Sequence, residues 1–296
     1  MRVRIFRDWS TSYPCDYDYK DMKIVNDDSY EYAILFNTPR PKLKVPKENV
    51  LGLAWEPKSL RKYKPYYQYA KDNIGMYVVG DSTGFQLPFC ENQTFMYDYR
   101  ISPPSLAATH PMSRIDSSLS KETQKVHPIC MVASEKKSLV GHKKRHSLIS
   151  KILKTDLDVH IYGKGINDVY KDPRIKGGFS LHCDVYPKYY FDITIENVRE
   201  GSFVTEKIFN PLVHRTCPIY WGSNKISSYC NDFYYSLPDN DDDCIEFLKK
   251  VSANYLDMYQ AKKAQIEKSR AAAIEYNYLD FAYNYFKTGK LDSKKI

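Results

Sequence analysis

The chain has 296 residues, of which 43% are hydrophobic and 27% charged, and its net charge is +8. This length suffices for two domains with separate cores, and the composition is that of a globular protein rather than a disordered or fibrous one. No run approaches the roughly 18 apolar residues of a membrane span, and the first residues turn charged too early for a signal peptide. We therefore expect a soluble, cytoplasmic protein whose positive charge favours anionic partners.

The first part of the chain contains four short apolar runs, at residues 3–6, 32–36, 50–55 and 75–79. Several are continuous rather than alternating, which is typical of strands that are covered on both faces. Residues 101–125 are rich in Ser, Pro, Ala and Thr, and this composition predicts a linker or an ordered loop. We expect residues 1–125, linker included, to form an N-terminal lobe.

Strands and helices are predicted to alternate after the linker. Strand-like runs occupy residues 129–133, 159–162, 191–195 and 217–221, and helical patterns occupy 146–153, 206–213 and 245–258. This alternation indicates βαβ units and a parallel sheet. We therefore predict an α/β protein with two Rossmann-like lobes facing a cleft, the second lobe spanning 126–275. The tail, 276–296, is aromatic and then Lys-rich, and it could pack on the first lobe or fray.

Residues 191–222 carry the most informative polar pattern, which we interpret as a strand, a loop with a glycine, a helix and a second strand. Thr205 is the predicted N-cap of the helix, and Glu206 and Lys207 fall in its first turn. The end of a parallel strand and the start of the next helix form the usual ligand edge of an α/β sheet, and their free amides attract phosphate. An isolated Glu–Lys pair would more often be a solvated helix start.

The pair is not isolated, because other fixed positions accompany it. The segment resembles the donor-binding motif of the α-1,3-fucosyltransferase family, glycosyltransferase family 10, at Phe191, Glu196-Asn197, Phe203-Val-Thr-Glu-Lys207 and 217–223. The resemblance implies the two-lobed GT-B architecture and donor binding by Asn197, Phe203, Glu206 and Lys207. Phe203 departs from the family, which has tyrosine there, so the hydroxyl contact to the donor is lost or supplied elsewhere.

Weaker resemblance extends upstream, through residues 130–135, 145–149 and 160–165. In that register Arg145 matches an arginine that holds the donor pyrophosphate, a task that suits the planar fork of a guanidinium. The apolar strand that ends at Glu56-Pro57 resembles the family strand whose glutamate is the proposed base, so the resemblance assigns proton abstraction from the acceptor to Glu56. A solvated helix residue and an ordinary strand-end carboxylate are the respective alternatives.

A metal site is not predicted. The seven cysteines are an odd number without CxxC spacing, which argues against zinc and against a complete disulfide framework and favours a reducing compartment. The seven histidines also lack metal spacing, and His142 with His146 is assigned to a basic helix that faces phosphate or solvent. The acidic run at 239–243 is more simply a helix cap than an Asp-x-Asp metal motif. We expect no cofactor other than the donor substrate.

The resemblance implies inverting transfer of L-fucose from GDP-β-L-fucose to a hydroxyl of a glycan, with an α-(1,3)-type linkage and no required metal. Three alternatives remain: another sugar nucleotide on the same fold, a protein that binds nucleotide sugars or carbohydrates without turnover, and a basic nucleic-acid binder. We rank the last lowest, because no nucleic-acid-binding module is recognisable. The acceptor and the oligomeric state are not readable from the sequence.

Overall fold

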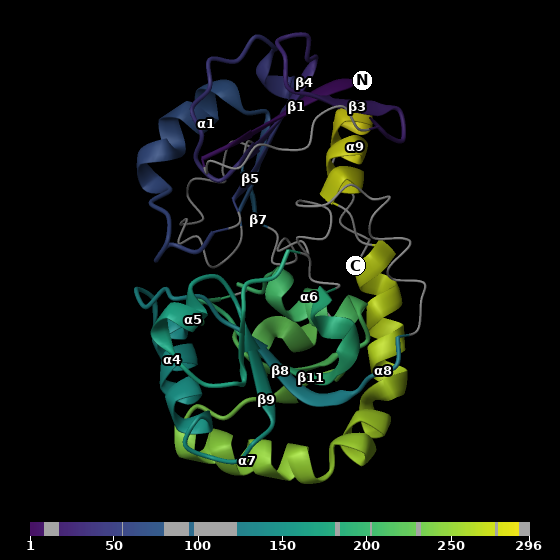
Figure 1. Ribbon diagram of the computed structural model, residues 1–296. Coiled ribbons are helices and arrows are strands. Elements are labelled where there is room, and N and C mark those ends of the chain that lie inside the picture. The colour runs from purple at the N-terminus through teal and green to yellow at the C-terminus, as the bar shows by residue number, and fades with distance from the viewer. Residues whose placement is uncertain are drawn as a thin grey trace. The chain divides into compact units, whose positions relative to one another are not determined.

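The computed structural model describes residues 1–8, 18–54, 56–79, 95–97, 123–180, 184–201, 203–228, 232–275 and 278–289. Most of the predicted linker, residues 101–122, lies outside these ranges. The chain divides into two compact units. The first consists of Met1–Ser113, Glu200–Phe203 and Tyr276–Ile296, and the second of Arg114–Arg199 and Val204–Glu275. Each unit is built on its own sheet (Figure 1).

The sheet of the first unit has the strand order β2-β3-β1-β4-β5-β6-β7. Its strands are β1 (Arg2–Arg7), β2 (Asp18–Tyr19), β3 (Met22–Val25), β4 (Tyr32–Phe36), β5 (Val50–Ala54), β6 (Met76–Val79) and β7 (Phe95–Tyr97). All neighbours are parallel except β2 and β3, which form an antiparallel pair. The four predicted runs are confirmed as β1, β4, β5 and β6, and every residue of β5 is buried. Helix α1 (Tyr67–Asn73) and the 3₁₀ helices η1 (Lys47–Asn49) and η2 (Lys64–Tyr66) lie between strands.

The C-terminal tail completes the core of the first unit. Helix α9 (Tyr278–Thr288) buries Leu279, Ala282 and Tyr285 in one hydrophobic cluster with side chains of β1, β3, β4, β5 and β6. Figure 1 shows the helix beside β1 and β3. Lys287 Nζ also lies 2.7 Å from a carboxylate oxygen of Asp21. Over its described residues, the tail therefore packs on the first sheet rather than fraying.

Within its described residues, the second unit contains a six-stranded, parallel sheet with the order β10-β9-β8-β11-β12-β13. Its strands are β8 (His127–Val132), β9 (Val159–Tyr162), β10 (Ile175–Gly177), β11 (Tyr189–Ile195), β12 (Cys217–Trp221) and β13 (Tyr235–Ser236). β8 and β11 are neighbours in the middle of the sheet. The strands that follow β8 in the chain, β9 and β10, lie on one side of this pair, and those that follow β11, β12 and β13, lie on the other. Such a reversal is the topological switch point at which open α/β sheets bind ligands, beyond the carboxyl ends of the strands.

The helices of the second unit are α4 (Val140–Ile152), α5 (Ile166–Val169), α6 (Glu206–Val213), α7 (Asp241–Ala253) and α8 (Tyr255–Glu275), with 3₁₀ helices η6 (Tyr186–Lys188) and η7 (Asn224–Ser228). The prediction for α6 is confirmed over its full length. The single helix predicted at 245–258 is wrong, because the chain breaks at Asn254. This residue ends α7 outside the helical region, with its N–H donating to the carbonyls of Lys250 and Val251.

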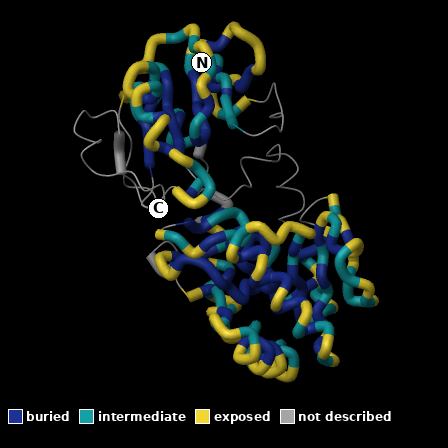
Figure 2. Tube along the Cα trace, turned by 90° about the vertical axis from the view of Figure 1, so that its left-hand side faces the viewer, coloured by how far each residue is buried: buried dark blue, intermediate teal, exposed yellow. Residues whose placement is uncertain are grey.

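The central strands of the second sheet are almost completely buried. β12 is buried at every position and β11 at all but Tyr190. Figure 2 shows buried segments in the interior of each unit and exposed residues along its outer turns. Cys130 and Cys217 are buried, as predicted. None of the helices in the described ranges has both the length and the hydropathy that a membrane span requires.

Candidate active site

The junction between β11 and α6 forms the expected strand–loop–helix unit. Thr205 is the N-cap of α6, and its hydroxyl oxygen accepts from the N–H of Lys207 at 3.4 Å. The prediction for Thr205 is therefore confirmed, and Glu206 and Lys207 occupy the first turn. The helix begins next to the carboxyl end of β11, which pairs with β8 at the switch point. An amino-terminal helix turn in this position attracts anions.

A completely buried carboxylate, that of Glu196, organises this junction. Its oxygens accept from the N–H of Thr205 at 2.8 Å and from the Thr205 hydroxyl at 2.8 and 3.0 Å. Lys207 Nζ lies 3.5 Å from the same carboxylate, 3.2 Å from Glu206 Oε1 and 3.0 Å from Thr205 Oγ1. Two carboxylates and a hydroxyl therefore fix the Lys207 ammonium. Sequence reasoning used Glu196 only as a motif position and missed this role, because its burial depends on the packing of the whole sheet.

The Lys207 charge stabilises the two carboxylates of the junction, although the carboxylates repel each other. Burial raises the pKa of Glu196, and the charge of Lys207 opposes that effect. Burial would also raise the pKa of Glu206, but the Lys207 charge and local hydrogen bonds bring it below its ordinary value. Burial would lower the pKa of Lys207, yet Glu206 and Glu196 outweigh it, so the pKa is raised. Lys207 therefore stays positively charged, and Glu206 ionised, across the physiological range.

Arg145 reaches the same sheet edge from α4. Its Nη1 and Nη2 atoms both lie 3.1 Å from Asn197 Oδ1, and Nη2 also donates to the carbonyl of Ile195. The Arg145 side chain is buried, which lowers its pKa, whereas the negative charges of Glu196 and Glu206 raise that pKa. Arg145 contacts Ile195 and Asn197, and Lys207 contacts Glu196, the residue between them. The two cations therefore share one edge of the second sheet.

A glycine allows α4 to approach this edge closely. The N–H of Gly141 donates to the carbonyl of Asn197 at 2.9 Å, and a Cβ at this position would lie 1.7 Å from the carbonyl oxygen of Glu196. His142 and His146 follow in α4, and both are buried. The solvent-facing alternative for these histidines is therefore wrong.

In the first unit, Glu56 follows β5 and its backbone is fixed on both sides. Its N–H donates to Asn37 Oδ1 at 3.0 Å, and its carbonyl accepts from the Tyr63 hydroxyl at 2.7 Å. Asn37 follows β4, is buried, and has the left-handed φ of 61°. Asp8 follows β1 and accepts from the N–H and hydroxyl of Thr38 at 3.2 and 2.9 Å. The carboxyl ends of three neighbouring strands thus gather polar groups, of which sequence reasoning identified only Glu56.

The acidic run at 239–243 caps α7. Asn240 is the N-cap and accepts from the N–H of Asp242 at 2.7 Å. Asp241 lies 3.2 Å from Lys144 Nζ, and Asp239 accepts from Arg199 and from the Trp221 indole at 2.8 Å each. The cap interpretation of the run is confirmed.

Comparison with known proteins agrees with this geometry. Residues 122–276 match the model of glycosyltransferase family 10 (fucosyltransferase), C-terminal domain. The match covers more than half of the chain and includes the whole Arg145–Lys207 sheet edge.

The chain belongs to glycosyltransferase family 10.

Two relatives of this family 10 chain carry fucosyltransferase names. A putative fucosyltransferase, R654, of Acanthamoeba polyphaga mimivirus is 33% identical over 79 residues, and the alpha-(1,3)-fucosyltransferase FucT of Helicobacter pylori is 34% identical over 77. These segments cover 25% and 24% of the chain but only 13% and 16% of the relatives.

A solved alpha-glucosyltransferase in complex with UDP-glucose and DNA containing an abasic site matches at a TM-score of 0.58 with 10% identity, covering 96% of this chain and 98% of that one. This likeness concerns the fold alone, and the predicted GT-B class, with two parallel-sheet domains, is confirmed.

The family 10 chain distributes the predicted site residues over both units. Arg145, Asn197, Glu206 and Lys207 lie together in the second unit, whereas Glu56 and Phe203 belong to the first. Phe203 is buried, and its N–H donates to the carbonyl of Glu200 at 2.9 Å.

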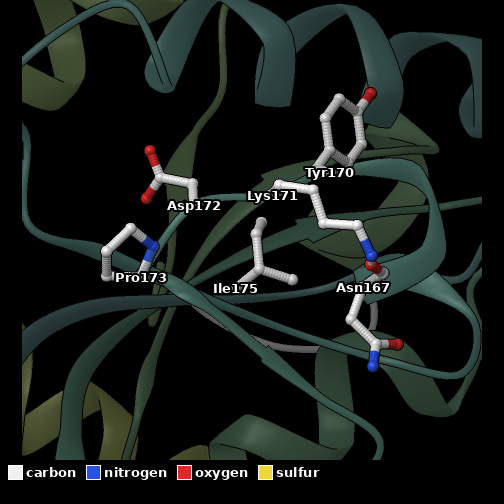
Figure 3. Close-up of a pocket in the computed structure, with 6 residues that line it drawn as sticks. All are labelled: Asn167, Tyr170, Lys171, Asp172, Pro173 and Ile175. Atoms are coloured by element: carbon white, nitrogen blue, oxygen red, sulfur yellow. Dashed lines mark hydrogen bonds between the residues drawn. The ribbon is translucent and has the colours of Figure 1, made fainter.

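A separate hollow of about 380 Å³ lies at the outer edge of the second sheet, between α5 and β10. It is lined by Asn167, Tyr170, Lys171, Asp172, Pro173 and Ile175 (Figure 3). The Lys171 amino group turns back to donate to the carbonyl of Asn167 at 2.7 Å, so this cation is engaged within the wall of the hollow. None of the predicted site residues lines it.

Proposed function

We propose that this protein is an inverting glycosyltransferase that moves L-fucose from GDP-β-L-fucose to a hydroxyl of a glycan acceptor. Family membership supports the fucosyltransferase class. The observation that carries the proposal is the Lys207 ammonium, which Glu196 and Glu206 hold at the start of α6, on the sheet edge that it shares with Arg145. A diphosphate is the ligand that such an edge suits best.

In the proposed reaction, the acceptor oxygen attacks the anomeric carbon of fucose while the bond from that carbon to the diphosphate oxygen breaks. The acceptor proton passes to Glu56, and GDP leaves with the bonding electron pair. Negative charge therefore grows on the diphosphate in the transition state. Lys207, Arg145 and the first amides of α6 would stabilise it, since preorganised charges act most strongly where charge develops. We propose that these groups serve without a catalytic metal.

The remaining side chains would orient the donor. Glu206 is about a third exposed and ionised, so its oxygens can accept from hydroxyls of the ribose or of fucose. Asn197 would present its amide from the end of β11, where Arg145 holds its oxygen. Phe203 has no hydroxyl, so we expect no hydrogen bond from it to the donor.

The test is Lys207→Ala, with Lys143→Ala as a matched control that removes an exposed lysine of α4. We expect donor turnover, measured as GDP release from GDP-fucose, to fall on the order of 100-fold in Lys207→Ala, as for the loss of one preorganised charge. It should be unchanged in Lys143→Ala. Lys207→Arg keeps the charge and should retain more activity than the alanine variant. Turnover at the parental rate in Lys207→Ala would contradict the mechanism.

Donor identity is tested separately by thermal shift. We expect GDP-fucose to raise the melting temperature more than GDP-mannose, UDP-sugars or dTDP-sugars. A larger shift with another sugar nucleotide would assign the same site to that donor. Stabilisation by GDP-fucose without GDP release, across a panel of glycan acceptors, would indicate a binding protein, the alternative that Phe203 raises.

A further inference from the structure

Three side chains that can ligate a metal meet where the strands of the second sheet begin, at the opposite end of these strands from Arg145 and Lys207. His127 opens β8, Asp158 precedes β9, and His160 lies within β9. In the described part of the chain, these three residues each offer one ligand atom, and the atoms all lie within 4.8 Å of one another. We propose that His127, Asp158 and His160 form a binding site for a divalent transition-metal ion of the Zn²⁺ class.

The spacing of the ligand atoms suits such an ion. Ligands about 2.0–2.1 Å from a tetrahedral zinc lie roughly 3.3 Å from one another. His160 Nε2 is 3.3 Å from Asp158 Oδ1. The His127 ligand atom lies within 4.8 Å of those of Asp158 and His160, which is at most about 1.5 Å more than the separation in a tetrahedral zinc site. Asp158 is 54% exposed, so an ion can enter from solvent and water can fill the fourth position.

A tyrosine pair orients the central histidine. His160 Nδ1 lies 2.7 Å from the Tyr189 hydroxyl, which lies 2.8 Å from the Tyr162 hydroxyl. Metal-binding histidines commonly donate their second ring N–H to such a partner, which fixes the tautomer. With Nδ1 protonated, the Nε2 lone pair points towards the Asp158 carboxylate. Without a metal, the other neutral tautomer carries its proton on Nε2, which can donate to Asp158 while Nδ1 accepts from the Tyr189 hydroxyl.

The types of ligand indicate the class of ion. Two imidazoles and one carboxylate suit Zn²⁺, and also Co²⁺ and Ni²⁺, better than Mg²⁺ or Ca²⁺.

The position of the site gives it a structural role. His127 and His160 lie on adjacent parallel strands, β8 and β9, at the end away from the proposed donor edge. A bound ion would link these strands without contacting the donor. We therefore expect saturating Zn²⁺ to raise the melting temperature by about 5 °C and to leave the rate of GDP release unchanged.

The experiment is isothermal titration of the full chain, without an affinity tag, with ZnCl₂ after removal of metals by a chelator. We expect one site. Affinity should fall on the order of 100-fold in His127→Ala, His160→Ala and Asp158→Asn. Asp156→Asn removes an exposed carboxylate from the same loop and is the matched control, with unchanged affinity expected. Tyr189→Phe keeps the ring but removes the Nδ1 partner, and it should weaken binding by about 10–100-fold.

A second measurement identifies the ligands. Co²⁺ bound at this site should show the intense visible absorption of four-coordinate cobalt, and that absorption should disappear in His160→Ala. Circular dichroism establishes that each variant is folded. Failure of the parent chain to bind Zn²⁺, or equal binding by the parent and both histidine variants, would overturn the proposal. Both results are independent of fucosyl transfer, so they leave the proposed function untouched.

Discussion

A buried carboxyl in the middle of β11 should make the stability of the second unit depend on pH. Asp192 is 2% exposed, and burial raises its pKa from the ordinary 3.8 to about 7. Cys130 Sγ lies 3.5 Å from one carboxyl oxygen, and the Thr194 hydroxyl donates to the other. These bonds and the charge of Arg145 offset only part of the cost of burying a charge.

The sign and size of the effect follow from the two pKa values. Because the pKa of Asp192 is higher in the folded than in the unfolded chain, its contribution to stability is fully present below about pH 4. That contribution is lost as the pH rises through about 7. The full loss corresponds to roughly 4 kcal/mol of unfolding free energy, and about 2.6 kcal/mol of it falls between about pH 5 and about pH 8.

Asp192→Asn tests this reasoning, because asparagine has nearly the same shape and no proton to lose. Urea unfolding of the parent and the variant is followed by far-ultraviolet circular dichroism at about pH 5 and about pH 8. The remaining titratable groups are common to both proteins and cancel in the comparison. The unfolding free energy of the variant relative to the parent should therefore rise by about 2–3 kcal/mol from the lower to the higher pH.

The control is Asp156→Asn, which changes an exposed aspartate of the same unit. Its difference from the parent should stay within about 0.5 kcal/mol at both pH values. If the Asp192→Asn variant differed from the parent equally at the two pH values, Asp192 would be ionised throughout, and the argument from burial would fail.

Three further changes have expected outcomes. Gly141→Ala places a Cβ 1.7 Å from the Glu196 carbonyl oxygen, so we expect a loss of about 1–3 kcal/mol in unfolding free energy by urea titration; an unchanged midpoint would contradict the close approach of α4. Asn240→Ala removes the cap whose side chain accepts from the N–H of Asp242 and should cost about 1 kcal/mol in the same assay, whereas Asn240→Asp should cost little. Glu56→Gln should lower fucosyl transfer on the order of 100-fold or more while leaving GDP affinity, measured by calorimetry, unchanged; a parental rate would exclude Glu56 as the base.

The sequence predicted the long, strongly apolar strands and missed the short ones. β4 and β12 are continuous hydrophobic runs whose pattern shows burial on both faces, and both were predicted. β10 and β13 have only three and two residues. They are strands because a neighbour supplies the hydrogen bonds, which no local pattern records. The break between α7 and α8 was missed for a similar reason, since helical periodicity continues across Asn254.

The candidate site was predicted as far as local pattern extends. Residues 191–222 form a contiguous motif, so the N-cap Thr205 and the first-turn pair Glu206 and Lys207 could be located from sequence. Glu196 belongs to that motif, but its role could not be assigned, since a carboxylate is understood only once its burial and its partners are known. Asn37 and Asp8 had no motif to mark them, because they meet Glu56 only where strands β1, β4 and β5 end side by side.

By itself, the sequence determined the order of the long apolar strands, the α/β class and the helix start at Thr205, because hydrophobic period and capping are properties of neighbouring residues. Only the tertiary structure decided that Arg145 bonds to the end of β11, and that His127 meets His160. These partners are separated by long stretches of chain, and parallel strands bring such residues together through a register that the packing of the whole sheet sets.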